Sequence, residues 1–448
     1  MNGGETIFAL SSARGKAGVA VVRVSGPAAM ASFKKLANLE AAPAPRQTLL
    51  RAIADPRDHS MIDRALIVPF KAPASFTGED VVEYHLHGSP AVVDGLLSAL
   101  SSFENHRMAE PGEFTRRAFE NGKLDLTEAE AVADLINAET QLQKQQALLQ
   151  MNGALSSLYE GWRARLIRTM AYIEAVIDFP DEDVPDSETR KVLPELAALT
   201  KEIESHLNDN RRGERLRDGI HIAIVGAPNA GKSSLLNLLA RRDVAIVSPV
   251  AGTTRDVIEA HLDLGGYPVI LADTAGLRPE EISEDGGHGS IESEGIRRAL
   301  ERAQNADLRL LVFDGTEKTL NPHTEKLRNE YSLVVYTKKD AAGFRAGKDG
   351  ISLSSTTGDG LDSVLAALTD KIKSLYALTR ETPSLTRARH RDALADCVAC
   401  LQKAQNAQAP ELMAEDIRVA ARSLGRITGR VDVEDLLDVI FRDFCIGK

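Results

Sequence analysis

One segment of the chain has residue types and spacing typical of polyphosphate binding. Residues 226–233 read Gly-Ala-Pro-Asn-Ala-Gly-Lys-Ser, between an apolar run and leucines at helical spacing. When a strand, a glycine-rich loop and a helix follow in this order, the loop N–H groups and the helix N-terminus point at the same phosphates. Lys232 is then placed to reach the β- and γ-phosphates, and the Ser233 hydroxyl to ligate Mg2+.

Two later segments fit the switch regions of a nucleotide hydrolase. Asp273 closes an apolar run and begins Asp-Thr-Ala-Gly, in which the Asp can hold a Mg2+ water and the Gly N–H can sense the γ-phosphate. Thr254 lies in Gly-Thr-Thr-Arg-Asp over 252–256, and we expect its hydroxyl on Mg2+ beside Ser233. Alone, Asp-x-x-Gly is a weak signal, and the alternative for 252–256 is an ordinary polar turn.

The base is indicated by residues 337–340, Thr-Lys-Lys-Asp, which follow an apolar run. Asp340 can accept two hydrogen bonds from the N1–H and 2-amino groups of guanine, which adenine cannot supply, so GTP is the predicted nucleotide. The first position of this motif is usually Asn, and here it is Thr337. This difference affects the expected rigidity of the loop and its affinity for the nucleotide. Ser354 and Ser355 match a weaker fifth element, whose backbone contacts the base.

Composition is that of an ordinary globular protein. The chain has 448 residues, which suggests about three domains, with 43% hydrophobic and 27% charged residues. The sequence has no 18-residue apolar stretch and no signal pattern, so we expect a cytoplasmic protein without a membrane span. A formal net charge of −11 disfavours a generally basic surface, so any RNA contact should be local.

Three clusters have a chemical and a structural interpretation. Cys397 and Cys400 have metal-like spacing, but they lie in a helical pattern with no second ligand pair, so buried helix thiols are favoured. His85-Leu-His87 is likewise favoured as a structural pair. The arginine runs over 211–217 and 387–391 are more often solvated faces or linkers than RNA sites.

Three kinds of patterning divide the chain. Strand-like runs and one helical run before residue 120 indicate an α+β domain. Helical periodicity extends from 124 to about 177, where Thr127 and Glu130 fit a capping box, and resumes over 385–444. Because the nucleotide motifs lie between these stretches, we expect an α/β Ras-like P-loop domain inserted into an all-α domain. The expected boundaries are 1–120, 121–215, 216–372 and 373–448.

The chain resembles the MnmE family of tRNA-modification GTPases, also called TrmE. The nucleotide motifs, Val-Ile-Asp-Phe-Pro-Asp-Glu over 176–182 and the terminal Phe-Cys-Ile-Gly-Lys over 444–448 carry the resemblance. It runs end to end and includes 75–80, 111–114 and 123–126.

The resemblance implies that the N-terminal domain dimerises and binds 5-formyltetrahydrofolate or a related tetrahydrofolate. Arg23, Glu83, Lys123 and Lys448 fall on the family's folate-site positions. Cations suit the folate's glutamate carboxylates, and a carboxylate suits the donor face of the pterin. From the residues alone, Arg23 and Glu83 would be strand-surface charges. Cys445 is a candidate reactive thiol if the chain end leaves it exposed.

The resemblance also implies a G domain that dimerises around GTP, with K+ in the role that an arginine finger fills elsewhere. The expected K+ ligands are Asn229, Ser248, Val250 and Thr253, and the expected Mg2+ ligands are Ser233 and Thr254. The residues expected at the nucleotide are Asn229, Ala230, Gly231, Lys232, Ser233, Ser234, Ser248, Thr253, Thr254, Asp273, Thr274, Ala275, Gly276, Lys338, Asp340, Ser354 and Ser355.

Glu292 aligns with the family's catalytic Glu, which orients the attacking water. Glu294 is the nearby alternative, and for either residue the plainer interpretation is a solvated charge on the following helix. The chain carries extra residues between Gly276 and Glu292, so the switch loop is longer than the family's.

The function that the resemblance implies is a homodimeric, K+-activated GTPase that forms a heterotetramer with a flavin-dependent MnmG (GidA)-type partner. Together they would convert C5 of the wobble uridine, position 34, of certain tRNAs to 5-aminomethyl or 5-carboxymethylaminomethyl derivatives, with a tetrahydrofolate one-carbon unit. The competing hypothesis is a regulatory GTPase switch in ribosome assembly, without modification chemistry. A third is a folate enzyme that GTP merely regulates.

Overall fold

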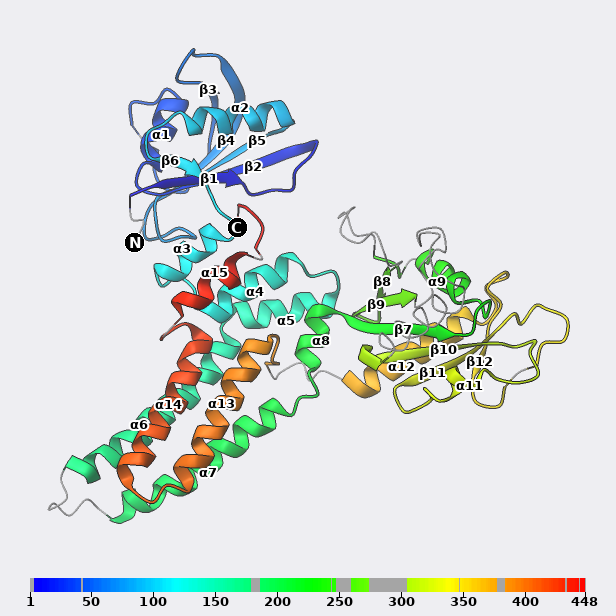
Figure 1. The fold of residues 1–448 in the computed structure, drawn as a ribbon. Coiled ribbons are helices and arrows are strands. Elements are labelled where there is room, and N and C mark those ends of the chain that lie inside the picture. Colours follow the sequence, from blue (N-terminus) through cyan, green and yellow to red (C-terminus); the bar gives the residue numbers. More distant parts are fainter. Residues whose placement is uncertain are drawn as a thin grey trace, which may run out of the picture. The chain divides into compact units, whose positions relative to one another are not determined.

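A computed structural model of the chain describes most of its residues. The described ranges are 4–41, 43–178, 186–242, 244–246, 259–273, 304–345, 347–376, 383–431, 433–442 and 444–447. They form two compact units (Figure 1). The first unit contains Met1–Ala133, Gln150–Thr189 and Asn406–Lys448, and the second contains Asp134–Leu149 and Arg190–Gln405.

The first unit begins with a six-stranded sheet of order β3-β4-β5-β2-β1-β6. Its strands are β1 (Thr6–Leu10), β2 (Ala17–Ser25), β3 (Leu49–Ala54), β4 (Met61–Phe70), β5 (Val81–Gly88) and β6 (His106–Met108). Neighbouring strands are antiparallel except β1 and β6. Helices α1 (Ala29–Leu36) and α2 (Pro90–Ser101) bury Phe33 and Leu96 with Tyr84 of the sheet. This domain is α+β, as the sequence predicts.

Helices complete the first unit. They are α3 (Glu113–Glu120), the start of α4 (Leu126–Ile136), α6 (Ala154–Asp178), α14 (Pro410–Thr428) and α15 (Glu434–Arg442). Helices α6 and α14 lie side by side (Figure 1). Thr428 donates a hydrogen bond to Glu160 at 2.8 Å across this pair. The C-terminal segment pairs with the N-terminal domain through a β-bridge between Pro111 and Ile446.

The start of α4 corrects the capping box expected at Thr127 and Glu130. The backbone N–H of Glu128 donates to Asp125 Oδ1 at 2.9 Å, and the N–H of Asp125 donates to Glu128 Oε2 at 2.8 Å. The reciprocal pair is therefore Asp125 and Glu128, two residues earlier. Thr127 instead donates its hydroxyl to Asp125 at 2.8 Å. Both pairs have the same spacing, and only the position of the first helical residue separates them.

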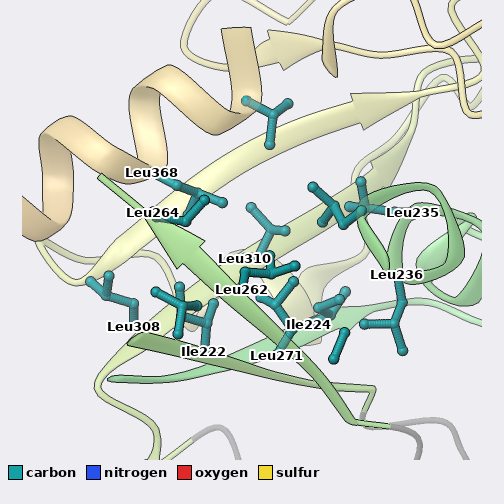
Figure 2. Close-up of a cluster of buried hydrophobic side chains, with 14 of the residues drawn as sticks. Ile222, Ile224, Leu235, Leu236, Leu262, Leu264, Leu271, Leu308, Leu310 and Leu368 are labelled. Atoms are coloured by element: carbon teal, nitrogen blue, oxygen red, sulfur yellow. The ribbon is translucent and has the colours of Figure 1, made fainter. Parts of the chain in front are cut away.

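The second unit is built on a six-stranded sheet of order β12-β11-β10-β7-β9-β8. Its strands are β7 (Ile220–Gly226), β8 (Glu259–Leu264), β9 (Tyr267–Asp273), β10 (Leu308–Asp314), β11 (Ser332–Thr337) and β12 (Ile351–Ser352). All neighbours are parallel except β8 and β9. Figure 2 shows Ile222 and Ile224 of β7 among leucines of the neighbouring strands and helices. This is the expected α/β P-loop architecture.

Helices complete the second unit. They are α5 (Gln141–Met151), α7 (Asp186–Leu207), α8 (Arg212–Asp218), α9 (Lys232–Ala240), α11 (Pro322–Glu325), α12 (Leu361–Tyr376) and α13 (Ala388–Gln405). Arg391 of α13 pairs with Asp209 and with Glu214 of α8, each at 2.7 Å. Arg217 and Arg387 both pair with Asp134. Members of both arginine runs thus form ion pairs within the unit.

Candidate functional site

The phosphate loop connects β7 to α9. Strands β7 and β10 approach so closely at Gly226 that a Cβ there would lie 2.3 Å from the Val312 carbonyl oxygen. Gly231 has a φ of +91°, in the left-handed region that favours glycine, and Asn229 has a φ of +62°. The Lys232 ammonium donates to the carbonyls of Gly226 at 3.0 Å and Ala227 at 2.9 Å. The lysine therefore lies over the loop that would hold the phosphates.

Thr337, the last residue of β11, joins the base motif to the phosphate loop. Its Oγ1 lies 2.6 Å from the carbonyl oxygen of Ala230 and 3.1 Å from that of Phe313. The side chain is buried, at 1% exposure. The hydroxyl therefore links two loops that are 107 residues apart in sequence.

Lys338 follows with a φ of +61° and is held by Asp314, the last residue of β10. Its Nζ lies 2.5 Å from Asp314 Oδ2, and Thr316 donates its hydroxyl to Asp314 Oδ1 at 2.6 Å. Burial would raise the pKa of the Asp314 carboxyl, but the hydrogen bonds from Lys338 and Thr316 outweigh it and hold the pKa below its ordinary value. Sequence reasoning missed Asp314, although an Asp at the carboxyl end of an apolar strand was the available signal.

Asp340 and Ser354 meet at the same edge of the sheet. The Ser354 hydroxyl donates to Asp340 Oδ1 at 2.6 Å, and this bond is the main cause of a lowered pKa for Asp340. The carboxylate therefore remains an acceptor at neutral pH. Phosphate loop, base motif and fifth element are thus gathered at the carboxyl ends of parallel strands, where open α/β sheets bind ligands.

Several predicted residues lie outside the described part of the chain. They are Ser248, Val250, Thr253, Thr254, Thr274, Ala275, Gly276, Glu292 and Lys448. Asp273 ends β9 in register with Ile224, but its side chain is likewise outside the described part.

In the first unit, Arg23 and Glu83 are neighbours across β2 and β5. Arg23 Nε donates to Glu83 Oε1 at 2.9 Å. The guanidinium lies 5.3 Å from the ring centroid of Phe76 and 5.7 Å from that of Phe114. Both charged side chains keep about a fifth of their surface exposed, 18% for Arg23 and 20% for Glu83. A ligand can therefore reach them.

Lys123 reaches the loop that carries Phe76. Its Nζ donates to the Pro73 carbonyl at 3.1 Å, and Asn121 donates to the Thr77 carbonyl at 2.7 Å. The loop thus contacts both predicted cations, Arg23 through Phe76 and Lys123 through Pro73. Cys445 is exposed in the neighbouring C-terminal segment.

The cysteine pair of α13 agrees with its predicted structural role in part. Cys397 is buried, and burial raises the pKa of its thiol to about 12, whereas Cys400 on the same helix is half-buried. His87 pairs with Asp63 at 2.8 Å. Within the described ranges, no group of three or more His, Cys, Asp or Glu side chains could hold a metal ion. Nor does any described helix combine the length and apolarity that crossing a membrane requires.

The geometry of the second unit defines a P-loop protein of the GTP-binding class. Two family models match the chain. Residues 6–123 match the N-terminus of the GTP-binding protein TrmE, and residues 126–445 match the MnmE helical domain. The chain belongs to the MnmE family of tRNA modification GTPases. It is therefore a GTP-hydrolysing enzyme of tRNA modification.

Relatives match over nearly the whole chain. A tRNA modification GTPase MnmE of Parvibaculum lavamentivorans is 56% identical, over 99% of this chain and all of the relative. One of Paramagnetospirillum magneticum is 52% identical with the same coverage. A mitochondrial protein of Danio rerio, named 5-taurinomethyluridine-[tRNA] synthase subunit GTPB3, is 46% identical over all of this chain and 94% of its own.

Proposed function

We propose that the protein is a homodimeric, K+-activated GTPase that acts with a flavin-dependent MnmG (GidA)-type partner on C5 of the wobble uridine of tRNA. The carbon would come from 5-formyltetrahydrofolate or a related tetrahydrofolate. The observation that carries the proposal is the reachable Arg23–Glu83 pair beside Phe76, in a unit of its own. A regulatory switch needs a nucleotide site alone, so this second charged site favours a modifying enzyme.

The residues of the first unit suit a folate. A pterin is planar and aromatic and presents N–H donors, which Glu83 can accept, while its glutamate tail carries carboxylates that suit cations. Arg23, Lys123 and Lys448 would supply those cations, and the Phe76 ring offers a face for the planar group. When bound, the folate would supply the one-carbon unit. Cys445, exposed nearby, is the candidate reactive thiol.

In the second unit, Lys232 would hold the β- and γ-phosphates and Asp340 the guanine. Ser233 and Thr254 would ligate Mg2+, and Asn229, Ser248, Val250 and Thr253 would ligate K+. Asn229 is exposed in a left-handed conformation, and its amide oxygen is the type of ligand that hard cations prefer. A cation there would neutralise charge that develops between the phosphates, while Glu292 orients the attacking water.

The name of one relative supports the proposal that the protein acts on a tRNA uridine together with a partner. The name of the Danio rerio protein describes a 5-substituted uridine of tRNA and a subunit of a larger synthase. A cytoplasmic location remains a prediction.

Folate binding tests the proposal. The dissociation constant for 5-formyltetrahydrofolate should rise about tenfold or more in Arg23→Gln and in Glu83→Gln, because each change removes a charged group that would hydrogen-bond to the ligand. Arg51→Gln, an exposed arginine on β3, is the matched control and should bind as the wild type does. Wild-type affinity in both site variants, or no binding by the wild type, would remove the folate from the proposal.

A further inference from the structure

The chain concentrates positive charge in one segment of the first unit. Residues 6–39 are the longest stretch without an acidic residue, although the formal net charge of the whole chain is −11. They contain five cations, Arg14, Lys16, Arg23, Lys34 and Lys35. An acidic protein that acts on a polyanion such as tRNA needs a local basic surface of this kind, because its overall field repels the RNA.

Arg14 and Lys16 lie in the turn between β1 and β2. Every residue from 13 to 19 is exposed, and among the residues that the structure describes, neither cation forms an ion pair. Other arginines of the first unit are engaged, since Arg107 and Arg117 both pair with Glu113. The turn therefore presents two charges that remain available to an anion.

The tip of the turn is open, whereas its base is fixed. A Cβ at Gly15 or Gly18 would meet no atom within 4 Å, so a ligand can approach the backbone closely. Below the tip, the Ser11 hydroxyl donates to the Gly447 carbonyl at 2.9 Å. The turn is thus attached to the C-terminal segment that carries the exposed Cys445.

Strand β2 leads from this turn to the proposed folate site. Arg23 lies six residues after Ala17, the first residue of β2, which is about 20 Å along an extended strand. Val22 and Val24 pack in the same core as Phe33 of α1, so Arg23 between them faces away from that helix. A nucleic-acid strand of about six stacked nucleotides, each rising about 3.4 Å, covers the same distance.

We propose that the turn between β1 and β2 binds backbone phosphates of the substrate tRNA through Arg14 and Lys16. Arginine can contact a phosphate bidentately and lysine as a point charge, and such contacts set the register of the RNA without reading its sequence. The proposal rests on the function proposed above, which brings the uridine to the site of Arg23. The turn then holds the strand a few nucleotides away from that base.

The composition of the turn favours RNA over a protein partner. Residues 11–18 read Ser-Ser-Ala-Arg-Gly-Lys-Ala-Gly, so apart from the two cations they are all small. They include none of the aromatic anchors that dominate protein interfaces. Aromatic side chains are also the platforms on which unpaired bases stack. Phosphates are therefore the part of the RNA that this surface fits.

The test is titration of the full chain with labelled, unmodified tRNA over a range of salt concentrations. In the double variant Arg14→Gln/Lys16→Gln, the Kd should rise about tenfold at about 100 mM salt, because two phosphate contacts are lost. The slope of log K against log salt should become shallower by about 1 to 2 for the same reason. Both positions are exposed, so the fold should be retained.

Lys34→Gln/Lys35→Gln is the matched control. It removes the same charge from the same acid-free segment, but on α1, and should keep the wild-type Kd and salt slope. Equal losses in the two double variants would overturn the proposal, because the effect would then be one of net charge. Wild-type Kd and slope in Arg14→Gln/Lys16→Gln would overturn it directly.

Folate binding separates this proposal from the function on which it rests. Loss of 5-formyltetrahydrofolate binding in Arg14→Gln/Lys16→Gln, with normal tRNA binding, would make the turn part of the folate site and would overturn the RNA contact. If Arg23→Gln and Glu83→Gln bind the folate normally while the turn variant loses tRNA, the folate assignment fails and the RNA contact stands.

Discussion

The Ser354 hydroxyl donates a 2.6 Å hydrogen bond to Asp340 Oδ1, and so orients the carboxylate that we propose selects guanine. The two residues come from different loops, at the ends of β11 and β12. A carboxylate fixed by a neighbour loses less freedom when it binds a base, and preorganisation of this kind raises affinity.

Removal of this bond should weaken nucleotide binding. In Ser354→Ala we expect the dissociation constant for GDP to rise about fivefold, since one hydrogen bond to a charged group is lost. Ser355→Ala is the control, because the neighbouring serine is predicted to act through its backbone. Titration with labelled GDP measures both, and equal losses in the two variants would argue against a specific role for Ser354.

Asp340→Asn should change the base preference of the nucleotide site from guanine to xanthine. Guanine presents two donors to a carboxylate, whereas an amide pairs better with xanthine, which carries a carbonyl in place of the 2-amino group. We expect GTP affinity to fall about 100-fold or more, with a gain for xanthosine triphosphate. Competition between the two nucleotides measures the shift, and loss of both without a change in their ratio would contradict the assignment.

Motifs that consist of adjacent residues could be predicted from the sequence. The phosphate loop, the flanking β7 and α9, and the α/β class follow from a run of adjacent residues. The contact between Thr337 and Ala230 could not be predicted from the sequence, because it joins positions 107 residues apart and depends on strand order. Strand β6 has three residues, and β3 exposes Leu50 at 55%, so neither shows the alternation that identifies a half-buried strand.

Charged contacts between different loops could not be predicted from the sequence either. Asp314 contacts Lys338 because β10 and β11 lie in register, which the sequence does not reveal. The shifted capping box of α4 illustrates the same limit, since two pairs of equal spacing competed for one helix start. Pro410 and Gly429, by contrast, lie where residue type alone favours helix ends, and they are the first residue and the left-handed C-cap of α14.

Glu113 should stabilise the first unit through its arginines. It contacts Arg107 at 2.6 Å and Arg117 at 2.9 Å, and keeps 10% of its side chain exposed. Glu113→Gln should lower the free energy of unfolding by about 2 kcal/mol at pH 7. The single tryptophan, Trp162 of α6, reports unfolding of this unit by fluorescence in urea. Glu120→Gln, on the same helix but half exposed, should cost less than about 1 kcal/mol.

The effect of Glu113 should depend on pH. Burial would raise the pKa of Glu113, but hydrogen bonds from Arg107, Glu110 and Arg117 lower it below its ordinary value. A carboxylate with a depressed folded-state pKa contributes stability above its unfolded pKa and loses it as pH falls through the folded value. The difference between wild type and Glu113→Gln should therefore shrink on acidification below the ordinary glutamate pKa. A gap that widens on acidification would contradict this account.

The three cysteines should react in order of exposure. Cys445 is exposed, Cys400 is intermediate, and burial raises the pKa of Cys397 to about 12. A thiol reagent at pH 8 should modify Cys445 first and Cys397 only on unfolding, because the thiolate is the reactive form. Loss of the fast phase in Cys445→Ser would identify it. A fast phase that persists in Cys445→Ser would place the reactive thiol elsewhere.

The most direct test of the central claim is GTP hydrolysis by the full chain in K+ against Na+ at equal ionic strength. We expect strong stimulation by K+ that Asn229→Ala abolishes, and loss of hydrolysis in both salts for Glu292→Ala. Asn237→Ala, the same substitution at an exposed position of α9, should keep the response to K+. Equal rates in K+ and Na+ for the wild type, or full K+ stimulation in Asn229→Ala, would contradict the cation-dependent mechanism.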